Sequence, residues 1–191
     1  MKNISIFASG SGTNAENIIK YFSNTKTARV NLILSNKPEA MVLKRAEALN
    51  TETFVFDYTD FYKTGKVLEK LRNSNTDFIV LAGFLWLVPA EIIDHYAGRI
   101  INIHPALLPA YGGKGMYGDA VHKAVISRGD TVSGITIHYV DTHYDQGSIV
   151  FQAKCRIEPG DTPEILASKV HHLEYKHFPR VIEELVMNLP F

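Results

Sequence analysis

The 191-residue sequence predicts an α/β fold with a mostly parallel sheet in its N-terminal part and an antiparallel pair of strands near its C-terminus. Three observations support this prediction. The strand-like runs of Val, Ile and Leu are uninterrupted, as in parallel strands that are buried on both faces. Segments with helical spacing separate these runs. The last two strand candidates are joined by a short polar loop without a crossover helix, so they are expected to pair antiparallel.

The N-terminal half alternates strands and helices. Residues 4–8 form a short apolar strand that ends in a glycine turn. Apolar residues at positions 15, 18, 19 and 22 have the spacing of one helix face and predict a helix over 15–22. The alternation continues with predicted strands at 30–34, 53–56 and 78–82, and with predicted helices at 39–49 and 61–71.

The C-terminal half begins with a short helix at 90–96 and a strand at 99–103. The antiparallel pair is predicted at 134–140 and 148–157. Thr162 then begins a long terminal helix, with Pro163 at the first helical position, where proline is tolerated. Because no repeat or linker interrupts the pattern, residues 1–191 are expected to form a single Rossmann-like domain.

Composition excludes several classes of partner. Twenty basic and twenty acidic residues give no net charge, which argues against a nucleic-acid partner. No apolar run approaches the ~20 residues that cross a bilayer, and the N-terminus has no signal-peptide core. We therefore expect a cytoplasmic protein without a membrane partner. The single cysteine, Cys155, lies in an apolar run and is expected to pack there, and no metal-binding motif is present.

The first strand is joined to the first helix by Ser-Gly-Ser-Gly-Thr-Asn-Ala at residues 9–15, which matches a dinucleotide-binding fingerprint. Helix N-terminal amides bind anions, and the glycines let the backbone approach a phosphate closely. The second strand ends at residues 34–37 without a carboxylate for a ribose, which favours a phosphomonoester over NAD. The alternative is an ordinary tight turn in which Thr13 or Asn14 caps the helix.

A second motif combines an amide, an imidazole and carboxylates. Asn102 and His104 lie two residues apart on a strand, so their side chains point to the same side. Such a pair can stabilise an oxyanion and move a proton, although both could instead be core residues bonded to backbone. Asp141 and Asp145 lie in the loop of the antiparallel pair, where plain turn chemistry is the alternative. A carboxylate beside His104 would orient the ring and raise its pKa.

Together these residues predict an acyl-transfer centre attacked directly by an external amine, because no Ser or Cys nucleophile is evident. His138 could face either this centre or solvent. The other helical histidines are expected to be surface or packing residues: His122, His171, His172 and His177. The apolar segment that ends at Trp86 could pack in the core or seat a flat heterocycle.

These motifs resemble the phosphoribosylglycinamide formyltransferase family, whose members act in folate-dependent purine synthesis. The resemblance is carried by residues 8–14, 81–84, 101–109, 134–138 and 144–147. Asn-Ile-His-Pro followed by Leu-Leu-Pro is typical of folate-dependent formyltransferases. The glycine turn and the single-domain length favour the glycinamide ribonucleotide branch, so the resemblance implies a formyltransferase fold.

The resemblance implies transfer of a formyl group from the cosubstrate 10-formyltetrahydrofolate to the amine of glycinamide ribonucleotide, without a metal. Asn102, His104 and Asp145 would be the catalytic residues. A charged His104, supported by Asp145, would stabilise the oxyanion together with the Asn102 amide. Asp145 would also help to remove the amine proton, through a water molecule or directly.

The resemblance also implies the binding residues. Gly12, Thr13 and Asn14 would hold the substrate phosphate, and Glu174 would contact the ribonucleotide. The residues implied for folate are Leu85, Trp86, Leu87, Val88, Asn102 and Asp141, with the loop at 141–145. Trp86 and the segment that ends at Lys63 stand where related chains often carry an arginine. Only small-molecule partners are implied, for a monomer or homodimer.

Other functions fit the sequence less well. Methionyl-tRNA and amino-sugar formyltransferases normally add a second domain, which this length does not accommodate. A formyltetrahydrofolate hydrolase usually begins with a regulatory domain, whereas the first strand here begins near residue 3. A nucleotide-binding module without catalysis would bind NAD or NADP. The missing ribose carboxylate and the additional Asn102, His104 and Asp145 argue against it.

Overall fold

The computed structural model describes residues 1–189, and its strands form one seven-stranded sheet in the order β3-β2-β1-β4-β5-β6-β7. The strands are β1 (Lys2–Phe7), β2 (Ala28–Ser35), β3 (Glu52–Val55), β4 (Phe78–Leu81), β5 (Ile100–His104), β6 (Val132–Tyr139) and β7 (Ile149–Arg156). The first five strands run parallel to one another. β6 is antiparallel to both β5 and β7, which confirms the predicted fold class and the antiparallel pair.

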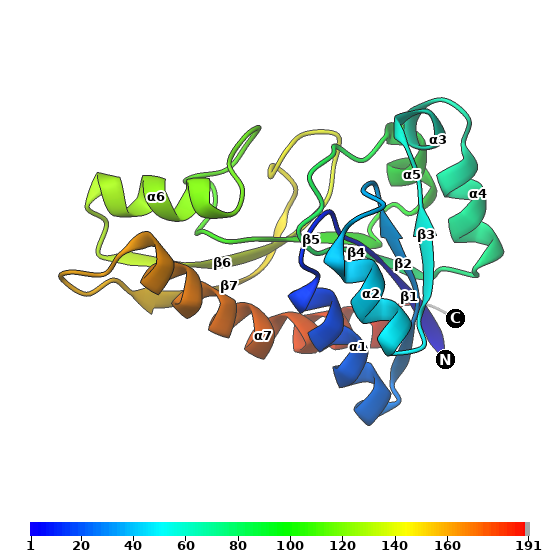
Figure 1. Ribbon diagram of the computed structural model, residues 1–191, viewed down its shortest axis with the longest axis horizontal. Helices are drawn as coiled ribbons and strands as arrows, with labels where there is room; N and C mark the ends of the chain where they lie inside the picture. The colour runs from blue at the N-terminus through cyan, green and yellow to red at the C-terminus, as the bar shows by residue number, and fades with distance from the viewer. Residues whose placement is uncertain (190–191) are drawn as a thin grey trace.

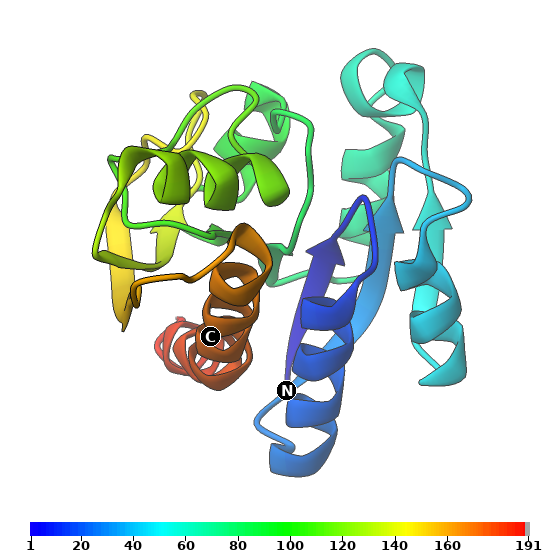
Figure 2. The ribbon, with the colours of Figure 1, turned by 60° about the vertical axis from the view of Figure 1, so that its left-hand side comes forward.

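The helices cover both faces of this sheet (Figure 1). They are α1 (Thr13–Thr25), α2 (Met41–Ala48), α3 (Tyr58–Tyr62), α4 (Lys66–Asn73), α5 (Ala90–His95), α6 (Asp119–Arg128) and α7 (Pro163–Met187). One hydrophobic cluster joins the sheet to α1, α2, α6 and α7, and a second joins it to α3, α4 and α5. Figure 2 shows α7 beside α1, and α6 above α7. Because both faces are covered, β4 is wholly apolar and buried, and the last four residues of β1 are buried as well.

Most predicted elements are confirmed within a few residues. The terminal helix begins as expected, with the Thr162 hydroxyl accepting a hydrogen bond from the Ile165 N–H and Pro163 at the first helical position. The predicted helix at 61–71 is wrong, because two helices replace it. Asp57 caps α3 with a capping box, and Gly65, at φ 69°, separates α3 from α4 in the left-handed region that favours glycine.

The glycine turn and β5 are brought together by the sheet order. β4 lies between β1 and β5, and all three strands run in the same direction. The turn after β1 and the segment after β5 therefore leave the sheet at the same edge, where parallel α/β sheets bind ligands. α6 follows the segment after β5 and packs against α7, so it closes one side of this region (Figure 1).

Candidate active site

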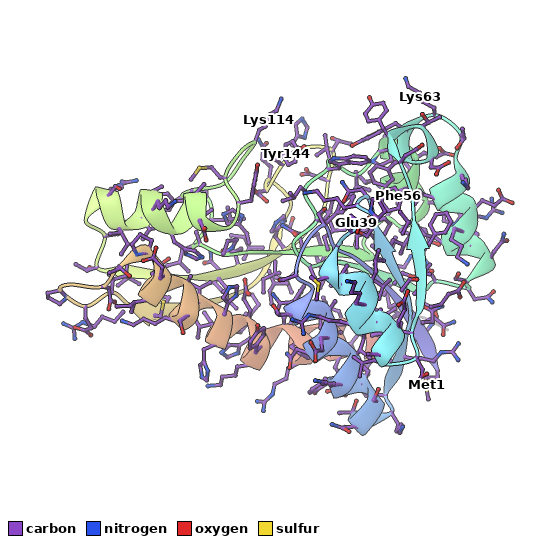
Figure 3. The ribbon with its side chains drawn as sticks, viewed as in Figure 1. Met1, Glu39, Phe56, Lys63, Lys114 and Tyr144 are labelled. Carbon is purple, nitrogen blue, oxygen red and sulfur yellow. The ribbon has the colours of Figure 1, made fainter. Side chains whose placement is uncertain are left out.

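A cavity of about 640 Å³ lies at this edge of the sheet. Its walls come from the glycine turn, the segment after β4, the end of β5, the segment before α6, and α7. Lys114 and Tyr144, both of which line the cavity, lie at the same end of the molecule on two different loops (Figure 3). The volume is within the range of about 300–1,000 Å³ that is usual for sites that enclose small molecules.

The structure brings Asn102, His104 and Asp145 together on one wall of this cavity. The Asn102 Nδ2 atom lies 3.5 Å from Asp145 Oδ1, and His104 Nδ1 lies 3.6 Å from Asp145 Oδ2. Asp145 also accepts a 2.9 Å hydrogen bond from the Gly113 N–H. The carboxylate thus sits between an amide and an imidazole, as expected if the three act on one reacting group.

Backbone geometry holds this group in place. His104 Nε2 lies 2.8 Å from the Tyr111 carbonyl oxygen, which can only accept a hydrogen bond, so this nitrogen carries the proton. Nδ1 is therefore the nitrogen at which the ring gains or loses a proton. Tyr111 and Asp145, which both contact His104, have φ values of 58° and 57°, in the left-handed region that non-glycine residues rarely adopt. Such conformations persist where the surrounding structure enforces them, and they cluster at functional sites.

His138, whose orientation the sequence leaves open, is buried and faces the site. It pairs with Asn102 in the register of β5 and β6. Its Nδ1 donates to the Tyr139 carbonyl oxygen at 2.8 Å, so Nε2 is free to accept from Asn102 Nδ2 at 3.1 Å. This bond fixes which way the Asn102 amide points. His138 is thus a positioning residue for Asn102.

Burial changes the protonation expected for the site. The sequence-based expectation that Asp145 raises the pKa of His104 gives the wrong net direction. Burial of the ring lowers the pKa below its ordinary value of 6.5 and outweighs the opposing effects of Asp145 and the Tyr111 carbonyl. Burial raises the pKa of Asp145, but the neighbouring His138 ring, with Nε2 3.5 Å from Oδ1, the Gly113 N–H and His104 together outweigh it, so the pKa of Asp145 is lowered. At neutral pH the resting site therefore contains a neutral imidazole beside an ionised carboxylate.

The glycine turn forms the opposite wall and presents backbone to the cavity. The N-cap of α1 is Gly12, at φ 74°, and no side chain caps the helix. The proposed alternative of a Thr13 or Asn14 cap is therefore wrong, because α1 begins at Thr13. The amides of the first helical turn remain open to an anion. A Cβ atom on Gly12 would lie 2.4 Å from Val42 Cβ, so only glycine fits here.

Side chains and helix α2 hold this turn from behind. The Val42 N–H donates to the Gly10 carbonyl oxygen at 3.2 Å, and Arg45 Nε donates to the Ser11 carbonyl oxygen at 2.9 Å. The Ser9 hydroxyl donates to Asn36 Oδ1 at 2.8 Å and accepts from the Leu85 N–H at 3.2 Å. Ser9 thereby ties the ends of β1, β2 and β4 together. Its position in the turn gave no sign of this role.

Glu174, which the resemblance assigned to the ribonucleotide, is 4 % exposed and lines the cavity. Its Oε2 atom accepts hydrogen bonds from Asn14 Nδ2 and His171 Nδ1, each at 2.8 Å. Lys37 also lines the cavity, next to the glycine turn, and adds a positive charge that the sequence analysis did not assign. The position of Lys37 just after the second strand could have indicated a ligand contact, because a dinucleotide-binding site has its acidic residue there.

The residues implied for folate divide into two groups. Leu85 lines the cavity, whereas Trp86, Leu87 and Val88 are not among its lining residues. Trp86 packs in the hydrophobic cluster that joins the sheet to α3, α4 and α5, and its ring centroid lies 6.0 Å from that of Tyr62. Burial raises the pKa of Tyr62 to about 12. Asp141 also lies outside the cavity lining and accepts a hydrogen bond from the His143 N–H, as in an ordinary turn.

The remaining histidines and Cys155 do not all follow expectation. His171 is exposed, as expected, but it also lines the cavity, and the buried His122 lines the cavity as well. His172 is exposed, and His177 packs against Phe151, with ring centroids 5.0 Å apart. Cys155 is partly buried, and burial raises the pKa of its thiol.

Among residues 1–189, no group of three or more His, Cys, Asp or Glu side chains is arranged to hold a metal ion. In the same part of the chain, no helix is long and apolar enough to cross a membrane.

A Rossmann-like sheet with an amide, an imidazole and a carboxylate opposite an uncapped helix N-terminus is typical of a group transferase. The chain belongs to the formyl transferase family, whose model matches residues 2–182. Within this family its relatives include the phosphoribosylglycinamide formyltransferase of Bacillus subtilis, which is 37% identical over 191 aligned residues. The alignment covers 97% of this chain and 95% of that relative.

Other relatives and solved structures agree. The chloroplastic phosphoribosylglycinamide formyltransferase of Arabidopsis thaliana is 39% identical over 187 residues, which span 95% of this chain and 64% of that relative. The crystal structure of the phosphoribosylglycinamide formyltransferase of Bacillus halodurans has a TM-score of 0.87 at 36% identity, covering 98% of this chain and 96% of that one. Glycinamide ribonucleotide transformylase 1 of Geobacillus kaustophilus has a TM-score of 0.88 at 34% identity, covering 97% and 99%.

Proposed function

We propose that this chain transfers the formyl group of 10-formyltetrahydrofolate to the amine of glycinamide ribonucleotide, a step of purine biosynthesis. The observation that carries the proposal is the convergence of Asn102, His104 and Asp145 on a cavity whose other wall is an uncapped helix N-terminus. The first feature suits attack on a carbonyl carbon, and the second suits a phosphate. Transfer of a formyl group to a phosphorylated amine, the activity for which the relatives are named, requires both.

The reaction is a direct acyl transfer. The amine nitrogen attacks the formyl carbon, the carbonyl oxygen gains negative charge, and the bond from the formyl carbon to N10 then breaks. The attacking nitrogen loses a proton and N10 gains one, so the products are the formylated ribonucleotide and tetrahydrofolate. One N–H of the Asn102 amide is held by His138, and the other, which lies 3.5 Å from Asp145 Oδ1 in the resting site, would turn to donate a hydrogen bond to the developing oxyanion.

His104 Nδ1 would hold the proton in transit. In the resting site the ring is neutral because burial lowers its pKa, and Nδ1 lies 3.6 Å from the Asp145 carboxylate. As negative charge develops on the formyl oxygen, the imidazolium form becomes more favourable, so the ring would gain the amine proton during the attack. Asp145 would then stabilise the charged ring and align it, directly or through water.

The two substrates would meet between the two walls. The open amides at residues 12–14, with Lys37 nearby, would hold the phosphate, and Glu174 would face the ribose. Phe84, Leu85 and Met116 give the cavity apolar surface that suits a pterin ring, with Tyr144 on the neighbouring loop. We further propose a cytoplasmic enzyme, as monomer or homodimer, with small molecules rather than nucleic acid or membrane as its partners.

The test is a formyl-transfer assay that follows tetrahydrofolate formation spectroscopically, with glycinamide ribonucleotide present or absent. We expect tetrahydrofolate to form from 10-formyltetrahydrofolate only when the ribonucleotide is present. Equal turnover in its absence would instead identify a hydrolase. No turnover under either condition, from protein with a cooperative thermal transition, would contradict the proposal.

A further inference from the structure

His122, in the first turn of α6, has features that packing does not explain. Its side chain is 3 % exposed and lines the cavity. Its Nδ1 atom is enclosed and has no hydrogen-bond partner. An apolar side chain of similar size would avoid the cost of burying an unpaired polar atom. The reaction outlined above assigns this ring no role, although it lines the same cavity as the glycine turn, Asn102 and His104.

The hydrogen-bonding state of the ring follows from this geometry. A proton on the enclosed Nδ1 would be a buried N–H without an acceptor, so the neutral ring carries its proton on Nε2. Nε2 makes no hydrogen bond within residues 1–189 and is not among the enclosed atoms, so it is open to the cavity. Burial lowers the pKa of His122, which keeps the ring neutral. The cavity therefore has a single neutral N–H donor at this point.

Glu174 supplies the matching acceptor. Its Oε2 atom takes the hydrogen bonds from Asn14 and His171, and Oε1 takes none within the described chain. The charges of His171 and Glu174 act on His122, and all three side chains line the same cavity. A neutral N–H donor that faces the same cavity as a carboxylate oxygen without a hydrogen bond suits a hydroxyl group, which accepts one hydrogen bond and donates another. A phosphate is a poor fit, because the carboxylate repels it.

We propose that His122 is a substrate-positioning residue whose Nε2–H donates a hydrogen bond to one ribose hydroxyl, which in turn donates to Glu174. This inference rests on the proposed function and extends it, because it adds His122 of α6 to Glu174 as a second residue that contacts the ribose. It places the sugar between the phosphate wall and the catalytic wall. The substrate amine then lies at a fixed distance from Asn102 and His104.

Steady-state kinetics with the whole chain test this assignment. Three acceptors are compared: glycinamide ribonucleotide and its 2′-deoxy and 3′-deoxy analogues. With the natural acceptor, His122→Leu should raise KM about 10- to 100-fold and change kcat less than about threefold, because the lost contact is to a group remote from the reaction. KM for 10-formyltetrahydrofolate should not change. His122→Gln keeps an N–H donor and should restore part of the affinity.

The deoxy analogues separate a specific contact from a structural effect. With the analogue that lacks the contacted hydroxyl, wild type and His122→Leu should have the same KM. His177→Leu, the same substitution on a histidine packed against Phe151, is the matched control and should leave every KM unchanged. Thermal unfolding of each variant accompanies the kinetics.

Three outcomes overturn the assignment. The first is a His122→Leu variant with the wild-type KM. The second is a KM increase of the same size for all three acceptors. The third needs no variant: neither analogue has a higher KM than the ribonucleotide with the wild-type protein. If the wild type is active, any of these results rules out only the role of His122. If the wild type is inactive, the proposed function is ruled out as well.

Discussion

The two walls of the cavity present different groups to a ligand: backbone amides on one wall and side chains on the other. At the glycine turn, the groups that face the ligand are backbone amides of α1, and Gly12 is there because nothing larger fits against Val42. At the end of β5, the groups are the side chains of Asn102 and His104, with the Asp145 carboxylate within 3.6 Å of both. The first wall depends on the shape of the backbone, and the second depends on the identity of its side chains.

The supports of the two walls differ in the same way. Helix α2 holds the turn through the carbonyl oxygens of Gly10 and Ser11. The catalytic side chains are instead held one by one, His104 by the Tyr111 carbonyl and Asn102 by His138. Adding atoms should therefore damage the first wall, and removing or exchanging polar atoms should damage the second. The following predictions test this difference, beginning with the largest effect.

Asp145→Asn should have the largest effect. The substitution keeps the size of the side chain but removes the charge that stabilises a protonated His104. We expect kcat to fall by about 10³-fold, within the range for loss of acid–base support, while KM for the ribonucleotide changes little. Steady-state kinetics and thermal unfolding measure both effects. If kcat stays within tenfold of wild type in the folded variant, the second wall does not depend on this side chain.

Gly12→Ala should damage the first wall by adding one carbon atom. The new Cβ would lie 2.4 Å from Val42 Cβ, at a φ of 74° that L-residues rarely adopt. We expect KM for the ribonucleotide to rise about 10-fold and stability to fall by about 1–3 kcal/mol from strain. Gly10→Ala is the matched control for stability, because its Cβ would meet nothing within 4 Å. Equal melting temperatures for the two variants would contradict the shape argument.

More of the first wall, at the glycine turn, can be predicted from the sequence than of the second wall, at the end of β5. Buried parallel strands are continuous apolar runs, so the order of strand, turn and helix around residues 4–22 is readable directly. The meeting of Asn102 with His138 depends on the register between β5 and β6, which no local pattern contains. Only the spacing of Asn102 and His104 on one strand face was available, and it predicted their common side.

Two other failures have local physical causes. Helix α6 was not assigned bounds, because glycines at 112–118 precede it and its apolar positions, Val121 and Val125, are few. Gly118 before it and Gly129 after it, both at positive φ, were the available boundary signals. Asp145 raises the pKa of His104 as predicted, but burial lowers it more, and the depth of burial cannot be predicted from the sequence as a neighbouring carboxylate can.

The protonation of His104 sharpens the comparison at the second wall. Burial lowers its pKa below 6.5, while the Asp145 charge acts in the opposite direction. We therefore expect the His104 ring signal in an NMR pH titration to have its midpoint below 6.5 in the wild type, so the neutral form dominates at pH 7. In Asp145→Asn the midpoint should move still lower, because the stabilising charge is lost. A midpoint above 6.5 in the wild type would mean that Asp145, and not burial, sets the charge of the ring.

Thr13→Ala should have the smallest effect, although Thr13 lines the cavity in the centre of the proposed phosphate site. Its side chain does not cap α1, and its backbone N–H is retained when the hydroxyl is removed. We expect KM for the ribonucleotide to stay within about twofold of wild type, since alanine is a better helix former than threonine and the turn is held from α2. Isothermal titration with the ribonucleotide measures its affinity for the variant, and thermal unfolding measures the stability of the variant. A tenfold loss of affinity at unchanged stability would show that the Thr13 hydroxyl itself binds the phosphate. The first wall would then depend on side-chain identity, as the second wall does.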